Sequence, residues 1–302
     1  MNPSFPKIYG QVKTHKSGLP IRPVVALYTD PSFHLSKLLA DWFRDTCQFK
    51  AKYTIRNSYE LASMLHQVKL PATSKAISFD AINLFTNTPV ARTINIMIDT
   101  LHKCRTPQAA VEEFRDLLAQ CTEKNSCIFR GTLDRFPDGL PMGGPLSMLL
   151  ADVFLDHLEN EILKTSTRNR FIHQWVRYVD GILCIWTGPE PEIHSFLQVL
   201  NDFETSIKFT LELGGLAINY LDLRIELVDH NNLLTPSFGI YRKATFTGVS
   251  IHADSLHPGT HKHAALNAAI HRVTQISLPP SGGRKRRGAS HSRNCKNQWH
   301  QG

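Results

Sequence analysis

Two aspartates in this chain, Asp80 and Asp180, stand where a divalent metal ion could be held. Asp80 ends a short apolar segment, residues 75–80, that is typical of a β-strand, and Asp180 lies in the predicted turn of a hairpin over residues 175–186. If the strand lies beside the hairpin, both carboxylates reach one edge of a sheet. Carboxylate oxygens are the hard ligands that Mg²⁺ prefers. Aspartates at strand ends and turns are also common for structural reasons, so the pair alone does not decide.

The elements that must position these aspartates are mixed. The hairpin turn is expected at Asp180-Gly181, between two apolar runs. Residues 145–164 form the strongest helix pattern, apolar on one face and acidic on the other. Helices and strands alternate without βαβ regularity, so an α+β fold is favoured over a doubly wound sheet. The remaining predictions are extended segments over 5–28 around a Gly18/Pro20 turn, a hairpin over 126–136 around Arg130-Gly131, strands at 207–213 and 217–228, and helices from Asp30-Pro31 onward, at 90–103, 108–121, 190–204 and 257–273.

Composition narrows the class of protein. The chain has 302 residues, 42% of them hydrophobic, which is enough for a buried core. No apolar run is long enough for a membrane span, the start lacks the apolar core of a secretory signal, and the six cysteines show no CxxC pair. These features predict an intracellular protein that is not secreted. The formal net charge is +8, but residues 279–302 hold six bases and no acid, so the rest is nearly neutral.

Several ordered sequence blocks surround the two aspartates. They are 9–16 (YGQVKTHK), 19–25 (LPIRPVV), 78–89 (SFDAINLFTNTP), 139–147 (GLPMGGPLS), 177–183 (RYVDGIL) and 241–247 (YRKATFT). The blocks at 78–89, 139–147 and 177–183 resemble motifs A, B and C of the reverse transcriptase palm. The finer resemblance is to the Penelope-like retroelement family, and it covers about residues 6–273.

The resemblance implies a right-hand polymerase fold and RNA-directed DNA polymerase activity. Asp80 and Asp180 would hold two Mg²⁺ ions, with Mn²⁺ as a substitute. One ion would lower the pKa of the primer 3′-OH, and the other would neutralise the triphosphate. The implied partners are an RNA template, a DNA primer and dNTPs. The implied domain, residues 1–278, divides into partial fingers (1–74), palm (75–235) and a thumb-like segment (236–278).

The resemblance also assigns substrate-binding roles to several residues, and each of these residues could instead have an ordinary structural role. Phe85 would exclude a ribose 2′-OH, or it is a core aromatic. Lys13, Lys16 and Arg22 would contact phosphate, or they are solvated surface cations. Gly143 and Gly144 would let the backbone approach the template or the incoming base, or they form an ordinary helix start. Lys208 would assist pyrophosphate departure, or it is a solvated strand lysine.

Two further segments, one rich in histidine and one rich in basic residues, have more than one interpretation. His252, His257, His261, His263 and His271 fit no familiar zinc spacing, so contact with a nucleic-acid backbone is favoured over a metal site. Residues 279–302 are expected to be a disordered basic tail. The tail is typical of a nuclear-localisation or nucleic-acid patch, of a solvated tail, or of read-through of non-coding sequence.

The chain departs from the family's motifs at three positions, the most important of them in motif C. Gly181 stands where the family has a second aspartate, Gly144 replaces a serine, and Met148 replaces a proline. Losing one carboxylate weakens Mg²⁺ binding, so an impaired polymerase is expected. The family's longer N-terminal region and its endonuclease are not seen in this sequence, so a truncated copy is expected. The alternatives are a catalytically inactive nucleic-acid-binding remnant and a viral RNA-dependent RNA polymerase, against which Phe85 argues.

Overall fold

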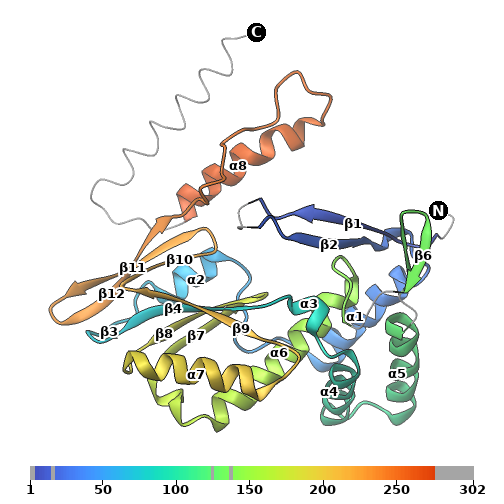
Figure 1. Cartoon of the computed structure of the whole chain (residues 1–302), viewed down its shortest axis with the longest axis horizontal. Coiled ribbons are helices and arrows are strands. Elements are labelled where there is room, and N and C mark those ends of the chain that lie inside the picture. Colours follow the sequence, from blue (N-terminus) through green and yellow to red (C-terminus); the bar gives the residue numbers. More distant parts are fainter. Residues whose placement is uncertain (1–3, 15–17, 124–125, 136–138, 276–302) are drawn as a thin grey trace. The chain divides into compact units, whose positions relative to one another are not determined.

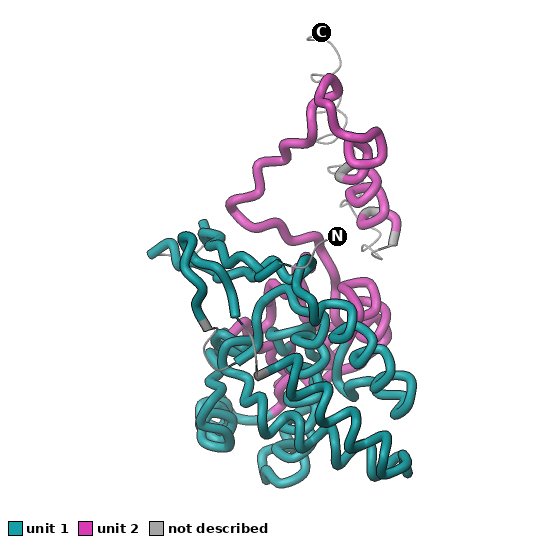
Figure 2. The backbone as a smooth tube through the Cα atoms, turned by 90° about the vertical axis from the view of Figure 1, so that its right-hand side faces the viewer, with its two compact units in different colours: residues 1–54, 79–182, 188–212 teal, residues 55–78, 183–187, 213–302 magenta. Residues whose placement is uncertain are grey.

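The structure is a computed structural model that describes residues 4–14, 18–123, 126–135 and 139–275. It divides into two compact units, each made of stretches far apart in the sequence (Figure 2). The first unit comprises residues 1–54, 79–182 and 188–212, and the second comprises 55–78, 183–187 and 213–302. Strands and helices are interleaved along the chain, as the sequence pattern predicted for an α+β fold. The predicted basic tail and Lys16 lie outside the described residues.

Several helices pack together in the first unit. The long helix α6 contacts both α1 and α4, and α5 packs beside α1 and α4 (Figure 1). Proline at the first position of α6 starts the helix without losing a needed hydrogen bond, because the first N–H groups of a helix have no partner. The bounds are α1 Phe33–Cys47, α4 Val90–Lys103, α5 Gln108–Glu123, α6 Pro145–Thr165 and α7 Glu190–Phe203.

Two sheets contribute to this unit. A four-stranded sheet has the order β2-β1-β5-β6, with β1 (Lys7–Val12) antiparallel to β2 (Ile21–Ala26). The predicted hairpin of β5 (Ser126–Phe129) and β6 (Thr132–Arg135) is confirmed, and both of its turn residues have positive φ angles, 50° at Arg130 and 85° at Gly131. The second sheet has the order β7-β8-β4-β9. Its strands are β4 Lys75–Ala81, β7 Ile172–Tyr178, β8 Gly181–Trp186 and β9 Phe209–Gly215.

An aromatic cluster anchors the first unit's part of that second sheet. The ring centroids of Phe79 and Trp175 lie 5.7 Å apart, and Phe196 of α7 is 6.0 Å from Phe79 and 5.9 Å from Trp175. Phe79 and Phe196 are completely buried. Burial of such side chains contributes roughly 1.5–3 kcal/mol each. The residue next to Phe79 is Asp80, so the strand that carries the predicted metal ligand is fixed by this cluster.

The described part of the second unit contains an antiparallel sheet of order β10-β11-β12-β3 and the helices α2 and α8. Arg272 of α8 makes an ion pair of 2.7 Å with Asp222 in the turn between β10 and β11. This contact ties α8 to the turn between the two strands. The bounds are α2 Ser58–Leu65, β3 Leu70–Pro71, β10 Ala217–Tyr220, β11 Leu223–His230, β12 Leu233–Ile240 and α8 Gly259–Gln275.

Several predicted boundaries were wrong. Helix α1 begins at Phe33, because the Asp30 side chain accepts a 2.7 Å hydrogen bond from the Ser32 N–H and forms a turn there. The segment 217–228 is two strands, since Leu221 adopts a positive φ of 55° and reverses the chain. The motif C hairpin turns at Val179 and Asp180, and Gly181 already belongs to β8.

The predicted acidic face of α6 also differs from expectation. Glu159 is 1% exposed and Asp152 is half-buried. These carboxylates bind groups of neighbouring elements instead of facing water, so α6 is buried on most sides. Among the described helices, none has the length and apolar character needed to cross a membrane.

Candidate active site

The two predicted metal ligands lie at the same end of neighbouring strands. The N–H of Ala81, the residue after Asp80, donates a 2.9 Å hydrogen bond to the carbonyl oxygen of Asp180. The last residue of β4 therefore meets the start of β8, and the two strands run in opposite directions. Asp80 and Asp180 are both exposed. This arrangement places two carboxylate-bearing residues at one sheet edge, open to solvent.

Lys208 joins them through its backbone but not through its ammonium group. The N–H of Ile82 donates a 2.7 Å hydrogen bond to the Lys208 carbonyl, and the Thr210 hydroxyl lies 3.4 Å from the Asp80 carbonyl oxygen. The Lys208 ammonium instead donates to the carbonyls of Asn201 and Glu204 at the C-terminal end of α7. A cation there satisfies carbonyls that lack helical partners. In this conformation, Lys208 caps a helix.

Phe85 lies beside the loop that precedes α6. Phe85 is half-buried in the short helix α3 (Leu84–Asn87), and its carbonyl accepts a 2.7 Å hydrogen bond from the N–H of Leu140. Gly139, one residue earlier, has a φ of +108°, and a Cβ atom there would lie 2.3 Å from the Thr86 carbonyl oxygen. Only glycine fits this close approach of two backbones. Sequence reasoning gave Gly139 no role of its own, although it begins the GLPMGG block.

The loop's other two glycines pack against the first sheet. Gly143 has a φ of +113°, and its missing Cβ would lie 2.8 Å from the Val25 carbonyl oxygen. A Cβ on Gly144 would lie 2.8 Å from the Ser147 hydroxyl oxygen. The Val25 N–H also donates a 3.0 Å hydrogen bond to the Met142 carbonyl. The glycines therefore allow β2 to sit on the loop, and this fold requirement stands beside the role proposed for them in substrate approach.

The predicted phosphate-binding cations belong to a different sheet from the aspartates. Arg22 is exposed on β2, where it pairs in register with Gln11 of β1, and Lys13 is half-buried just after β1. The structure thus joins Asp80, Asp180 and Lys208 at one set of strand ends. It attaches the sheet of Arg22 and Lys13 to the site through the Val25–Met142 hydrogen bond.

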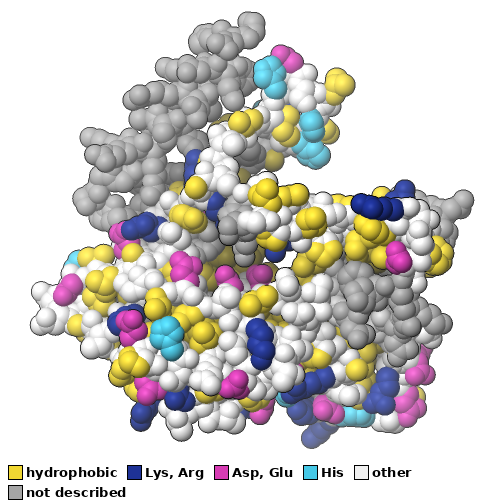
Figure 3. All heavy atoms as spheres, in the orientation of Figure 1, with side chains coloured by type: hydrophobic (Ala, Val, Ile, Leu, Met, Phe, Trp, Pro, Cys, Tyr) yellow, Lys and Arg dark blue, Asp and Glu magenta, His cyan; other side chains and the backbone are white. Residues whose placement is uncertain are grey.

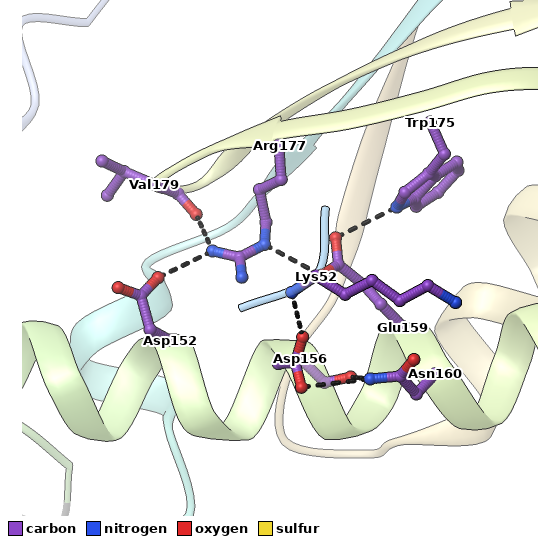
Figure 4. Close-up of polar contacts among 8 residues, drawn as sticks. All are labelled: Lys52, Asp152, Asp156, Glu159, Asn160, Trp175, Arg177 and Val179. Carbon is purple, nitrogen blue, oxygen red and sulfur yellow. Dashed lines mark hydrogen bonds and ion pairs between the residues drawn. The ribbon is translucent and has the colours of Figure 1, made fainter. Parts of the chain in front are cut away.

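Behind the hairpin lies a buried arginine to which sequence reasoning gave no role. Arg177 is 0% exposed, and it is the one Lys or Arg with a buried side chain among the described residues. Its Nε donates to Glu159 Oε2 at 3.1 Å, and its NH1 donates to Asp152 Oδ1 at 2.9 Å (Figure 4). The same NH1 lies 3.2 Å from the Val179 carbonyl oxygen, one residue before Asp180. The signal in the sequence was the position of Arg177, three residues before the motif C aspartate.

Burial and neighbouring charges shift the pKa values of the ionisable groups in this cluster. Burial raises the pKa of Glu159, and the Arg177 guanidinium and the Trp175 N–H, which donates at 3.0 Å, act in the opposite direction. Burial lowers the pKa of Arg177, but Glu159 and Asp152 outweigh it and the pKa is raised. Arg177 is therefore a permanent buried cation whose charge is balanced by two carboxylates of α6.

The donor set at the sheet edge limits what metal it can hold. The described residues contain no group of three or more His, Cys, Asp or Glu side chains that could hold a metal ion, and this includes the histidines of 252–271. Asp80, Asp180 and nearby backbone carbonyls offer hard oxygen ligands, which fit Mg²⁺ when water and substrate phosphate complete its coordination. Gly181, buried at the start of β8, offers no side-chain ligand.

The arrangement of strands and helices is similar to that of known polymerases. Telomerase from Candida tropicalis, in complex with the TWJ fragment of telomeric RNA, has a TM-score of 0.55 at 10% identity, covering 89% of this chain and 49% of that chain. The BmCPV RNA-dependent RNA polymerase at the elongation state has a TM-score of 0.53 at 13% identity, covering 90% of this chain and 24% of that chain. This chain has a right-hand polymerase fold.

These similarities define the fold and not the family. A further RNA-dependent RNA polymerase structure, with vp4 and dsRNA, has a TM-score of 0.55 at 13% identity over 80% of this chain and 22% of that one. This chain therefore spans about half or less of the length of these polymerases. No protein-family model matches the sequence, and no curated protein matches it.

Proposed function

We propose that this chain is the polymerase domain of a retroelement reverse transcriptase of the Penelope-like type, impaired at motif C. In this proposal it adds dNTPs to a primer 3′-OH on an RNA template. The observation that carries the proposal is the hydrogen bond from Ala81 to Asp180, which sets two aspartates at adjacent strand ends within a right-hand polymerase fold. The sequence blocks, in family order, support the retroelement assignment.

In this function Asp80 and Asp180 would hold the metal ions, which supply electrostatic stabilisation for the attacking oxygen and the leaving phosphate. The chain's own residues position the reactants. Phe85, held beside the Gly139 loop, would close the space that a ribose 2′-OH needs. Arg22, exposed on β2, would bind phosphate.

The test is primer extension on poly(rA)/oligo(dT) with dTTP and either Mg²⁺ or Mn²⁺. The full chain and its Gly181→Asp variant are compared, with circular dichroism to verify folding. We expect weak extension by the chain and stronger extension by the variant. No extension by either folded protein would refute the polymerase proposal. Incorporation of UTP as efficient as that of dTTP would instead favour an RNA polymerase.

A second function is favoured by one observation, the absence of a third carboxylate at Gly181. In this alternative the chain is an inactive nucleic-acid-binding remnant. It predicts salt-sensitive binding to an RNA–DNA duplex, with no turnover and with an affinity that Asp80→Ala does not change. Incorporation of dNTPs at a rate that Asp80→Ala reduces would exclude this alternative.

A further inference from the structure

A cluster of three charged side chains, two of them completely buried, lies beneath the motif C turn. Arg177 and Glu159 have side chains that are 0% exposed, and the Asp152 side chain is 26% exposed. Burying a cation in this way costs more free energy than an apolar side chain of similar size would, even when the cation is paired. A buried cation is also unable to touch nucleic acid. The presence of Arg177 therefore needs an explanation other than stability or phosphate binding.

The contacts of Arg177 point to the turn that carries Asp180. Its NH1 donates to the carbonyl oxygen of Val179 at 3.2 Å, and Val179 has a φ of 56°. That left-handed conformation is unfavourable for a β-branched residue, so surrounding contacts must hold it. The same NH1 also donates to Asp152, and the Nε of Arg177 donates to Glu159, so both carboxylates anchor the guanidinium (Figure 4).

The anchor belongs to the helix that follows the glycine loop. Asp152 and Glu159 lie on α6, which begins at Pro145, directly after Gly143 and Gly144. The N–H of Arg177 also donates a 2.8 Å hydrogen bond to the Tyr53 carbonyl, which fixes the strand itself. The guanidinium thus connects α6 to the Val179 carbonyl. It does so with a planar fork of donors that a lysine ammonium cannot reproduce.

We propose that Arg177 is a positioning residue: it holds the Val179–Asp180 turn in its strained conformation and so sets Asp180 beside Asp80. This inference rests on the proposed function for its consequence, the binding of metal between the two aspartates. The turn geometry itself is a property of the folded chain and is measurable without turnover. Arg177 acts through Val179 and does not touch substrate.

The test uses the full chain and the Arg177→Lys variant, which keeps the charge and removes the fork. The reporter is the Ala81 amide, since its hydrogen bond ends on the Asp180 carbonyl. Hydrogen exchange of this amide, observed with ¹⁵N-alanine labelling, should become about tenfold faster or more relative to amides of α5. The control is Arg168→Lys, which changes another Arg–carboxylate pair, 2.7 Å from Arg168 Nε to Glu192 Oε2, and should leave Ala81 unaffected.

A purely structural role would speed exchange in α5 and at Ala81 equally, and that result would overturn the proposal, as would unchanged exchange. If Arg177→Lys does not fold, Asp152→Asn removes one charged anchor at a half-buried site and should loosen Ala81 selectively, though less. Mn²⁺ binding, measured by electron paramagnetic resonance, is compared in the same proteins and in an Asp80→Asn variant. If exchange of the Ala81 amide becomes selectively faster but Mn²⁺ binding does not depend on Asp80, the positioning role is supported and the metal site is refuted. If exchange becomes selectively faster, and Mn²⁺ binding depends on Asp80 and is weakened by Arg177→Lys, both the positioning role and the metal site are supported.

Discussion

The sheet edge that carries Asp80 and Asp180 differs from the layer behind it in how polar groups are held. At the edge, the two aspartates are exposed, and a backbone hydrogen bond joins their strand ends. Behind it, Arg177 is completely buried and bound by Asp152, Glu159 and the Val179 carbonyl. The residues proposed to do chemistry are thus accessible, and the residues that fix their geometry are not.

The outer surfaces of the first unit show a related contrast. The β1–β2 hairpin carries exposed apolar side chains as well as Arg22, and hydrophobic atoms are visible over these strands (Figure 3). Tyr9, Val12 and Ile21 are 47%, 52% and 65% exposed. Around Asp80, by contrast, the side chains that pack are aromatic and buried. Close packing of buried side chains is therefore found beneath the aspartates, so substitutions in this buried layer and at the exposed edge should have different consequences.

The largest effect is expected at the edge and on activity alone. Asp80→Asn, made in the Gly181→Asp background, should reduce primer extension by about a thousandfold or more, because a metal ligand is lost. The melting temperature should hardly change, since Asp80 is exposed. Asp202→Asn, at an exposed position of α7, is the matched control and should retain full activity. Equal activity of the two variants would show that Asp80 is not a ligand.

The next effect is on stability and belongs to the buried layer. Glu159→Ala leaves the Arg177 cation without one of its partners, so the free energy of unfolding should fall by about 3–5 kcal/mol. Urea denaturation measures it. Glu161→Ala, on the same helix but with a side chain 42% exposed beside Lys164, should change the free energy by less than about 0.5 kcal/mol. A similar loss in both variants would contradict a special role for the buried pair.

The glycine loop gives an intermediate effect. Gly139→Ala should destabilise the protein by about 2–3 kcal/mol, because the new methyl group meets the Thr86 carbonyl and the φ of +108° is unfavourable for alanine. At Gly131, φ is +85° but no atom lies within 4 Å of the added Cβ. Gly131→Ala should therefore cost about 1–2 kcal/mol. Thermal unfolding compares the two variants, and a larger cost at Gly131 would argue against the close approach.

The smallest expected effect is a pH dependence. Burial lowers the pKa of His157 on α6, with Arg92 and Lys103 adding to the shift and Glu161 opposing it. The native state therefore binds fewer protons at this site than the unfolded state. The melting temperature should fall as the pH drops below about 6.5, the ordinary histidine value. His157→Gln should flatten that decline, whereas His173→Gln, at an exposed position, should preserve it. An unchanged slope in His157→Gln would exclude this residue as the source.

Much of this fold is readable from local patterns. The helix predicted at 90–103 coincides with α4, and the turn at Arg130-Gly131 contains a glycine, which tolerates positive φ. Among the elements that were not predicted, α2 and β12 had local signals in the sequence. The Asn57 side chain accepts a hydrogen bond from the Glu60 N–H, a helix-start pattern, and Asn231-Asn232 forms the two-residue turn before β12.

The candidate site could be predicted only in part from the sequence, because contacts between distant segments determine its geometry. Asp80 and Asp180 were found from strand ends and turn residues, but their meeting depends on a hydrogen bond between segments far apart in the sequence. The burial of Arg177 depends on α6, which was expected to face water on its acidic side. The side chain of Lys208 follows the end of α7, and no local pattern around Lys208 indicates that. Tertiary contacts decided each of these.

Restoring the missing carboxylate tests whether Asp80 and Asp180 form a metal site that lacks one ligand. Mg²⁺-dependent incorporation of dTTP on poly(rA)/oligo(dT) is measured for the chain, for Gly181→Asp and for Gly181→Asn, which adds similar volume without charge. If Asp80 and Asp180 form an impaired two-carboxylate metal site, Gly181→Asp should raise the rate by about 10²–10⁴-fold, and Gly181→Asn should not. Equal rates in all three folded proteins, or no incorporation by any, would contradict the account.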